Sequence, residues 1–491
     1  MRSRTDSSES EVMGVIIGNA ILFGSADSSA AAPSGENDSI WTGLARKAVS
    51  SIYDPMGYVT AIRPYAFYSC ASLRSVSFPM ARTIGDYAFY SCRYLSSISF
   101  PLTREIGSYA FYSCSWVREA VFPSARAVGS YAFQSCFSLT AVSFPALREI
   151  GYHAFGNCRG ITNADFPKAE NIGSGAFYYC SGIRTLSFPA AVTIGSEAFA
   201  GCRMESFFFP NVTEVGSGAF KWNPSLTTMC LPAMTVIADE EFYSCSALSA
   251  VAFPSVTSIG ARAFMYCRSL VDMSFPKVRS LGASAFAYCS SLPSVVFPLV
   301  NQIGTYAFCR CSALTEVNIQ YARSIGMYAF QGCSALPEVS FSVALSVGGY
   351  AFQSCSALSR VFLPVVKTIE SYTFHGCTSL TEAFFPRAVS IGSSAFYGCS
   401  ALKMVSLPGV SSIASGAFQQ CVNLVSLYLL GPVICTLAAS SVFSSTPIGG
   451  FSDVAGELGT IYVPESLYSS YITRNGWYYL SSRIVSVPSE E

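Results

Sequence analysis

The sequence predicts a repeat solenoid, mainly β, in which about 17 coils of one design stack on each other. A phenylalanine recurs seventeen times from Phe67 to Phe418, every 22 residues except for one gap of 21 between Phe199 and Phe220. The same apolar positions recur around it in each period. The chain is 51% apolar and only 12% charged, a balance that favours a folded core over disorder. Because a solenoid grows by adding coils, its 491 residues need not form several ordinary domains.

The second half of each period favours a short strand. In the first period Leu73, Val76 and Phe78 supply the apolar side chains, and equivalent residues recur one coil later. Such strands stack in parallel, about 4.8 Å apart. Pro79 ends the strand because proline cannot donate a ladder hydrogen bond. No coil can bury its apolar face alone, so we expect stability to come from neighbouring coils and both ends to need caps.

The return leg opens with Ile84 and Gly85, and equivalents of both residues recur along the chain. The recurring glycine indicates either a positive φ or a close approach of two backbones. Ala88 and Phe89 follow, and we predict them on a short helical or 3₁₀ turn. The small alanine permits close packing, and the phenylalanine fills the space between the legs. Stacking then turns every position of the period into a ladder of like residues.

Sixteen of the 19 cysteines lie three residues after an anchor phenylalanine, and Asn223 takes that place in the eighth coil. A disulfide framework is typical of small domains without a core, and a metal site needs ligands that converge. We therefore interpret the ladder as free cysteines, buried as small apolar side chains at a turn. Asn223 fits, because a polar side chain can bond the backbone there. The cysteine ladder consists of Cys70, Cys92, Cys114, Cys136, Cys158, Cys180, Cys202, Cys245, Cys267, Cys289, Cys311, Cys333, Cys355, Cys377, Cys399 and Cys421.

The unit Ile-Gly-x-x-Ala-Phe-x-x-Cys-x-x-Leu-x-x-Val-x-Phe-Pro resembles the BspA-type leucine-rich repeat, over residues 61–430. The segment from Thr446 to Trp477 resembles the C-terminal part of bacterial proteins with these repeats, and residues 13–17 are similar to repeat proteins of gut bacteria and prophages. The resemblance implies a right-handed leucine-rich-repeat stack with little helix. It also implies cell-surface adhesion, or binding of host or matrix proteins, and no catalytic residues.

Composition and spacing argue against several classes of function. With 29 basic and 29 acidic residues the net charge is zero, so nucleic acid is an unfavourable partner, and no apolar run reaches the roughly 20 residues that span a membrane. His153 and His375 lie ten coils apart, roughly 50 Å, and both are expected on the solvated surface. The acidic run Asp239–Glu241 is expected to form an exposed turn. The sequence therefore predicts a protein that is not an enzyme, without catalytic residues, cofactor or metal ligands.

Tyrosine recurs two residues before the anchor phenylalanine in two groups of four. The first stripe consists of Tyr65, Tyr87, Tyr109 and Tyr131, and the second stripe of Tyr306, Tyr328, Tyr350 and Tyr372. Tyrosine offers amphipathic contact area at low entropic cost, so the stripes are a candidate binding surface for an extended protein or glycan ligand. The alternative is that the rings only cover the outer flank of the coils. The outward positions of the strands are expected to form a flat surface of small residues: Ser75, Ser77, Ser97, Ser99, Ala141, Ser143, Thr185 and Ser187.

We divide the chain into an N-terminal β-hairpin and flexible linker (1–38), an N-terminal cap (39–60), the solenoid (61–430), and a degenerate repeat with a C-terminal cap (431–491). Trp477, Tyr478 and Tyr479 are expected to cover the last layer of the core. Together these features predict a non-enzymatic binding scaffold, secreted or displayed on a cell surface, that acts in adhesion or in protein or glycan recognition.

The alternative is a structural, tail-associated component of a phage or prophage, attached through the N-terminal hairpin. The N-terminal residues leave both hypotheses open. The apolar run from Val12 to Gly24 could serve as a signal peptide with cleavage near Ala32, but Asp6 and Glu9 give it an acidic flank where a signal sequence carries positive charge.

Overall fold

The computed structural model describes residues 50–54, 57, 59–450 and 458–488. These residues fall into two compact units, one ending at Ala233 and one beginning at Met234. The predicted N-terminal hairpin and linker, and most of the predicted N-terminal cap, lie outside the described residues. The division into hairpin, caps and solenoid therefore stays a prediction.

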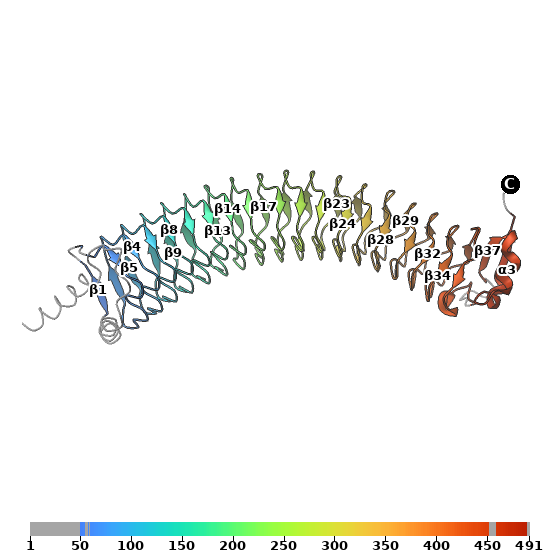
Figure 1. Ribbon diagram of the computed structural model, residues 1–491, viewed down its shortest axis with the longest axis horizontal. Helices are drawn as coiled ribbons and strands as arrows, with labels where there is room; N and C mark the ends of the chain where they lie inside the picture. The colour runs from blue at the N-terminus through green and yellow to red at the C-terminus, as the bar shows by residue number, and fades with distance from the viewer. Residues whose placement is uncertain (1–49, 55–56, 58, 451–457, 489–491) are drawn as a thin grey trace, which may run out of the picture. The chain divides into compact units, whose positions relative to one another are not determined.

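In the first unit each coil contributes one strand of three residues and one of two (Figure 1). The longer strands are β1 (Ser51–Tyr53), β3 (Ser75–Ser77), β5 (Ser97–Ser99), β7 (Glu119–Val121), β9 (Ala141–Ser143), β11 (Asn163–Asp165), β13 (Thr185–Ser187), β15 (Ser206–Phe208) and β17 (Thr228–Cys230). The shorter strands are β2 (Ala61–Ile62), β4 (Thr83–Ile84), β6 (Glu105–Ile106), β8 (Ala127–Val128), β10 (Glu149–Ile150), β12 (Asn171–Ile172), β14 (Thr193–Ile194) and β16 (Glu214–Val215), which form one eight-stranded sheet.

The second unit repeats this plan. Its longer strands are β19 (Ala250–Ala252), β21 (Asp272–Ser274), β23 (Ser294–Val296), β25 (Glu316–Asn318), β27 (Glu338–Ser340), β29 (Arg360–Phe362), β31 (Glu382–Phe384), β33 (Met404–Ser406) and β35 (Ser426–Tyr428). Its shorter strands are β18 (Val236–Ile237), β20 (Ser258–Ile259), β22 (Ser280–Leu281), β24 (Gln302–Ile303), β26 (Ser324–Ile325), β28 (Ser346–Val347), β30 (Thr368–Ile369), β32 (Ser390–Ile391), β34 (Ser412–Ile413) and β36 (Thr436–Leu437). Both units are therefore parallel β-solenoids, as the period predicted.

The register places like residues of neighbouring coils against each other. Val76 of β3 pairs with Ile98 of β5, and Ile62 of β2 pairs with Ile84 of β4, all in parallel. The anchor rings stack in the same way: those of Phe67 and Phe89 lie 5.0 Å apart at 15° and are fully buried. Each such ring removes its apolar surface from water, about 1.5–3 kcal/mol, and stacking adds about 0.5–1.5 kcal/mol. The core is thus a continuous set of ladders within each unit.

The return leg differs from the expected helical or 3₁₀ turn. Between Gly85 and Cys92 alternate amides bond within the coil and to the next coil: Tyr90 N–H donates to Tyr87 O, whereas Phe89 N–H donates to Ala110 O. The segment is a series of turns, because Tyr87, two residues before Phe89, and Ser91, two residues after it, have φ of 56° and 55°. Left-handed residues interrupt any helix there.

The recurring glycine serves close approach and not a positive φ. A Cβ built on Gly129 would lie 2.6 Å from the backbone carbon of Gly107 in the preceding coil, and one on Gly151 would lie 2.6 Å from that of Gly129. Only glycine lets the two backbones stack at this spacing. Of the two explanations that the sequence left open, the structure confirms the second.

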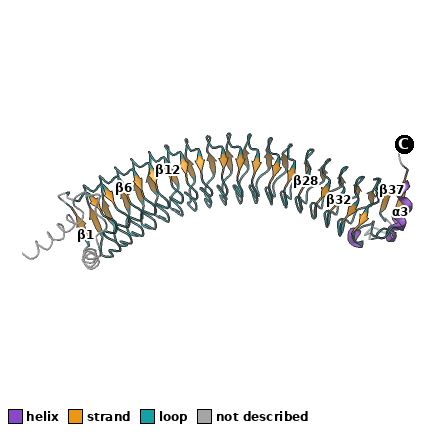
Figure 2. Ribbon diagram, viewed as in Figure 1, coloured by secondary structure: helices purple, strands orange, loops and turns teal. Residues whose placement is uncertain are grey.

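Among the described residues, helix is confined to the C-terminal part of the second unit (Figure 2). It comprises the 3₁₀ turns η1 (Ser440–Phe443), η2 (Glu465–Leu467) and η3 (Tyr478–Arg483), and α3 (Tyr468–Thr473), beside β37 (Thr460–Pro464) and β38 (Ile484–Val487). Trp477 is fully buried and donates from Nε1 to Cys435 O over 2.7 Å. Tyr478 and Tyr479 are 62% and 41% exposed, so the expectation that these two cover the core was wrong.

Candidate binding surface

The cysteine ladder is an internal feature of the coils. Fourteen of the ladder thiols donate to the carbonyl of the anchor phenylalanine in the preceding coil, as Cys92 Sγ does to Phe67 O over 3.0 Å. All sixteen ladder cysteines are free and buried, which confirms the interpretation as packing. Burial raises the pKa of the Cys202 thiol to about 12, so it is an unreactive thiol at neutral pH.

Asn223 performs the same task with an amide. Its Nδ2 donates to Phe199 O and to Phe220 O, each over 2.8 Å, and its Oδ1 accepts from Met204 N–H over 3.3 Å. The side chain is fully buried. The polar replacement therefore satisfies backbone groups, as expected from the sequence, but inside the coil.

The tyrosines of both stripes occupy a left-handed backbone position. In all seventeen coils the residue two before the anchor phenylalanine has φ between 49° and 66°, whether it is Tyr, His, Gly, Glu, Arg or Ser. A left-handed L-residue costs roughly 1–2 kcal/mol. The amide at this position donates to the next coil, as Tyr87 N–H does to Ser108 O over 2.9 Å, and these bonds hold the conformation. We call this position the first left-handed column.

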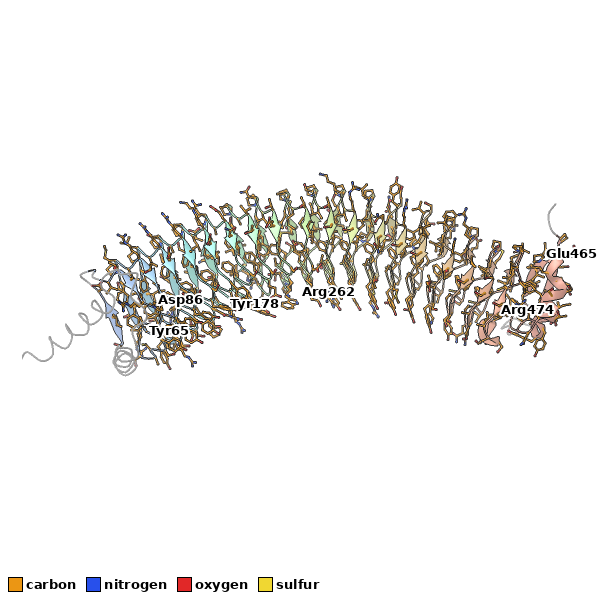
Figure 3. The ribbon with its side chains drawn as sticks, viewed as in Figure 1. Tyr65, Asp86, Tyr178, Arg262, Glu465 and Arg474 are labelled. Atoms are coloured by element: carbon orange, nitrogen blue, oxygen red, sulfur yellow. The ribbon has the colours of Figure 1, made fainter. Side chains whose placement is uncertain are left out.

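The rings of the first stripe stack face to face. Tyr65 and Tyr87 lie 4.9 Å apart at 3°, and Tyr109 and Tyr131 lie 4.6 Å apart at 18°. A parallel row of Tyr68, Tyr90 and Tyr112 stacks at 4.9 Å beside it. Figure 3 shows the stripe's first member, Tyr65, which is 54% exposed; the other three members are half-buried.

The second stripe has the same geometry. Tyr306 and Tyr328 lie 4.5 Å apart at 1°, and the next two pairs, Tyr328–Tyr350 and Tyr350–Tyr372, are stacked at 4.6 Å. Tyr306 is 37% exposed and the other three rings are half-buried. In each unit the structure thus brings the four predicted tyrosines together as one continuous row.

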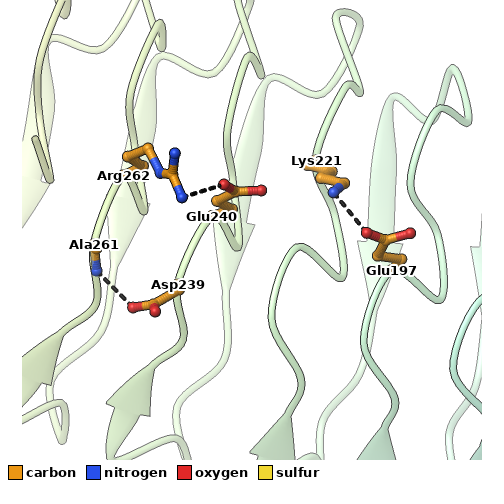
Figure 4. Close-up of polar contacts among 6 residues, drawn as sticks. All are labelled: Glu197, Lys221, Asp239, Glu240, Ala261 and Arg262. Carbon is orange, nitrogen blue, oxygen red and sulfur yellow. Dashed lines mark hydrogen bonds and ion pairs between the residues drawn. The ribbon is translucent and has the colours of Figure 1, made fainter.

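At two places where tyrosine is absent from the column, a glutamate of the column forms an ion pair with a basic residue of the next coil (Figure 4). In the first unit Lys221 Nζ lies 2.7 Å from Glu197 Oε1 and 4.4 Å from the centre of the Trp222 ring. In the second unit Arg262 lies 2.9 Å from Glu240 Oε1. Lys221 is buried, whereas the Arg262–Glu240 pair is partly exposed and contributes little to stability.

Three expectations about the surface need correction. Glu241 is fully buried, because it stands where other coils have the small inward alanine; burial raises the pKa of its carboxyl well above the usual value. His153 and His375 are half-buried and not fully solvated, and burial lowers the pKa of each. The strand face is not uniformly small, since Val121 and Phe362 point outward and are 52% and 49% exposed.

Among the described residues, no three His, Cys, Asp or Glu side chains are grouped so that they could hold a metal ion. In the same part of the chain, no helix combines the length and apolarity that a bilayer span requires.

Each of the two parallel β-solenoids buries Leu, Val and Ile residues at recurring positions and stacks the Phe rings of successive coils. These features define a leucine-rich-repeat protein. The chain belongs to the BspA-type leucine-rich-repeat family: the family described as "BspA type Leucine rich repeat region (6 copies)" matches residues 60–181, 104–227, 213–337 and 301–425. As a class, such solenoids are scaffolds that bind other molecules on extended surfaces.

Solved structures to which the chain is similar include a leucine-rich repeat protein from Bacteroides ovatus, 20% identical, with a match that covers 89% of this chain and 92% of that one and a TM-score of 0.44. A leucine-rich repeat protein from Eubacterium ventriosum is 23% identical over 57% of this chain and 82% of its own, with a TM-score of 0.42. A leucine rich cell surface protein from Faecalibacterium prausnitzii is 22% identical over 66% and 82%, with a TM-score of 0.34. Comparison with curated proteins gave no match.

Proposed function

We propose that the protein is a non-enzymatic binding scaffold, displayed on a cell surface, and that its tyrosine stripes dock an extended protein or glycan ligand in adhesion. One observation carries the proposal: each unit presents four tyrosine rings in register, stacked at 4.5–4.9 Å and open to solvent along one side. Stacking holds the rings in place before the ligand arrives. A pre-ordered aromatic row loses little side-chain entropy on binding, which favours affinity.

Serine is the replacement that the backbone accepts at these positions. Ser284 and Ser394 occupy the same column naturally, with φ of 58° and 53°. A variant with all four second-stripe tyrosines changed to serine therefore removes the aromatic surface without forcing the coil into a new conformation. It also removes three stacked pairs, about 0.5–1.5 kcal/mol each, which thermal unfolding will register.

The matched control changes two exposed aromatic residues of the same unit that lie outside the stripes, Tyr321→Ser and Phe362→Ser, which are 60% and 49% exposed. Beads coated with each full-length variant are tested for adhesion to matrix-coated surfaces and on a glycan array. We expect the stripe variant to lose most of its adhesion and the control to retain it. Undiminished adhesion of the stripe variant would remove the support for this binding surface.

A further inference from the structure

The second unit contains a recess outside the tyrosine stripes. It has a volume of about 500 Å³ and lies beside the residues two after the anchor phenylalanines, which we call the second left-handed column. Its lining includes the side chains of Arg268, Tyr288, Ser290, Arg310, Ser312 and Gln331, and we call it the arginine–tyrosine recess.

Two tyrosine rings position the guanidinium groups of the recess: Arg268 lies over a ring of its own coil and Arg310 over a ring of the preceding coil. Tyr266, Tyr288 and Arg310 have φ of 66°, 63° and 58°, so their side chains leave the coils in the same direction. The rings of Tyr266 and Tyr288 stack at 4.7 Å. The guanidinium carbon of Arg310 lies 5.7 Å from the centre of the Tyr288 ring, and that of Arg268 lies 5.9 Å from Tyr266. A guanidinium held over a ring keeps the N–H groups at its edge available to a ligand.

The next coil keeps this space open. Gly332 continues the column after Arg310, and a Cβ built there would lie 3.3 Å from Arg310 Cγ. Beside it, Gln331 Nε2 donates to Gln353 Oε1 over 2.7 Å, and Cys309 Sγ donates to Gln331 Oε1 over 3.4 Å. The amide is thus fixed in place at the wall of the recess.

The recess carries positive charge without compensation. Arg268 and Arg310 are exposed, no acidic residue lines the hollow, and within the described residues neither guanidinium forms an ion pair. Serines also line the recess: Ser312 Oγ donates to Ser290 O over 3.3 Å, which leaves the Ser312 oxygen free to accept. The lining therefore offers hydrogen-bond donors for an anion and acceptors for hydroxyl groups, but no aliphatic side chain that could contact an apolar part of a ligand.

We propose that the arginine–tyrosine recess binds an acidic saccharide, with carboxylates of its sugar rings paired to Arg310 and Arg268 and ring hydroxyls bonded to Ser312 and Gln331. The two arginines project from coils that are two apart, roughly 10 Å by the strand spacing, so a short oligomer can reach both. An acidic peptide fits less well, because the recess provides neither an apolar subsite nor an unpaired strand edge. The site uses no residue of either tyrosine stripe, so it extends beyond the function proposed above and can fail independently of it.

The test is isothermal titration of the full-length chain with trigalacturonic acid. Its methyl ester, which has the same shape without charge, serves as the matched control ligand; a hexaglutamate peptide and inorganic sulfate complete the series. We expect saturable binding of the acid, weakened by salt, and little binding of the other three.

Arg310→Gln and Arg268→Gln should each reduce the affinity about tenfold or more, as expected for the loss of a hydrogen bond to a charged group. Glutamine is compatible with the column, since Gln420 occupies it with φ of 61°. Arg360→Gln, at an exposed arginine on β29, should change the affinity less than about twofold, as expected for a neutral surface substitution. Absence of binding, equal binding of the ester or the peptide, or unchanged affinity in both recess variants with an unchanged unfolding temperature would overturn the proposal.

Discussion

Replacing Asn223 by alanine tests how the solenoid satisfies its buried backbone. The wild-type amide donates to Phe199 O and Phe220 O and accepts from Met204 N–H. Alanine removes all three bonds in a place that water does not reach, because residue 223 is fully buried. Phe199 O keeps its bond from Cys202 N–H at 3.4 Å. A lost buried hydrogen bond costs about 0.5–1.5 kcal/mol, a buried group left without a partner costs about 1–3 kcal/mol, and the long bond from Met204 N–H at 3.3 Å should count least. We therefore expect Asn223→Ala to lower the free energy of unfolding by about 2–5 kcal/mol.

The consensus residue provides the matched control. Asn223→Cys restores the thiol that donates to the preceding coil elsewhere, as Cys202 does to Phe177 O over 3.1 Å. It should retain one of the donated bonds and lose less than half as much stability as the alanine variant. Urea unfolding followed by circular dichroism gives both values, and hydrogen exchange of residues 199–226 localises the loss when unfolding is not two-state. A change below about 0.5 kcal/mol for alanine, or an equal loss for cysteine, would refute the proposed role of these hydrogen bonds.

Three further predictions follow from burial and backbone geometry. Native alkylation should label the exposed Cys230 first and leave the sixteen ladder cysteines unlabelled until denaturation, as mass spectrometry will show; rapid native labelling of the ladder would contradict burial. Gly129→Ala places a Cβ 2.6 Å from a neighbouring backbone and should cost more than about 2 kcal/mol, whereas Gly398→Ala, at φ 70° in open space, should cost about 1 kcal/mol; thermal unfolding that reversed this order would refute the close-approach explanation. Burial raises the pKa of the Glu241 carboxyl in the folded state, so its protonated form favours folding below about pH 4.5 and that contribution is lost as the pH rises. Glu241→Gln should therefore match wild type near pH 4 and be the more stable protein at pH 8, and an equal effect at both pH values in urea unfolding would contradict this sign.

The sequence was most informative where every coil repeats one requirement. A strand was predicted from Leu73, Val76 and Phe78. The observed strand is shorter, Ser75–Ser77, with Val76 inside and its neighbours outward, while Leu73 and Phe78 are buried just beyond its ends. The two-residue strand at Thr83–Ile84 was not expected, because a single inward residue is too short to show an alternating pattern. The sequence predicted that the ladder cysteines are buried as packing residues. It did not predict their hydrogen bonds to phenylalanine carbonyls, because these bonds depend on how neighbouring coils are offset and the pattern within one period does not show that.

Positions where one coil departs from the others were the hardest to predict. Glu241 was expected outside because Asp239 and Glu240 precede it, but the inward register of the coil continues regardless of residue type. A comparable replacement shows the compensation: Thr373 also stands at the inward alanine position, and its hydroxyl donates to Glu370 O over 2.7 Å. The arginine–tyrosine recess was missed because its residues come from different positions of different periods.

The two left-handed columns explain why variation concentrates where it does. Each column could have been recognised from Gly175, Gly218 and Gly416, or from Gly201 and Gly332, which mark positions that a positive φ favours. Between glycines the columns hold Tyr, His, Glu, Arg, Ser, Asn, Trp and Gln, because the backbone bonds to the next coil fix the conformation and the side chain points away from the core. The inward Phe and Cys positions cannot vary in this way without opening a cavity or removing a hydrogen bond to a buried carbonyl. A solenoid of this design can thus vary its surface by substitutions in the two columns without disturbing its core. The tyrosine stripes lie in the first column, and Tyr288 and Arg310 of the arginine–tyrosine recess lie in the second.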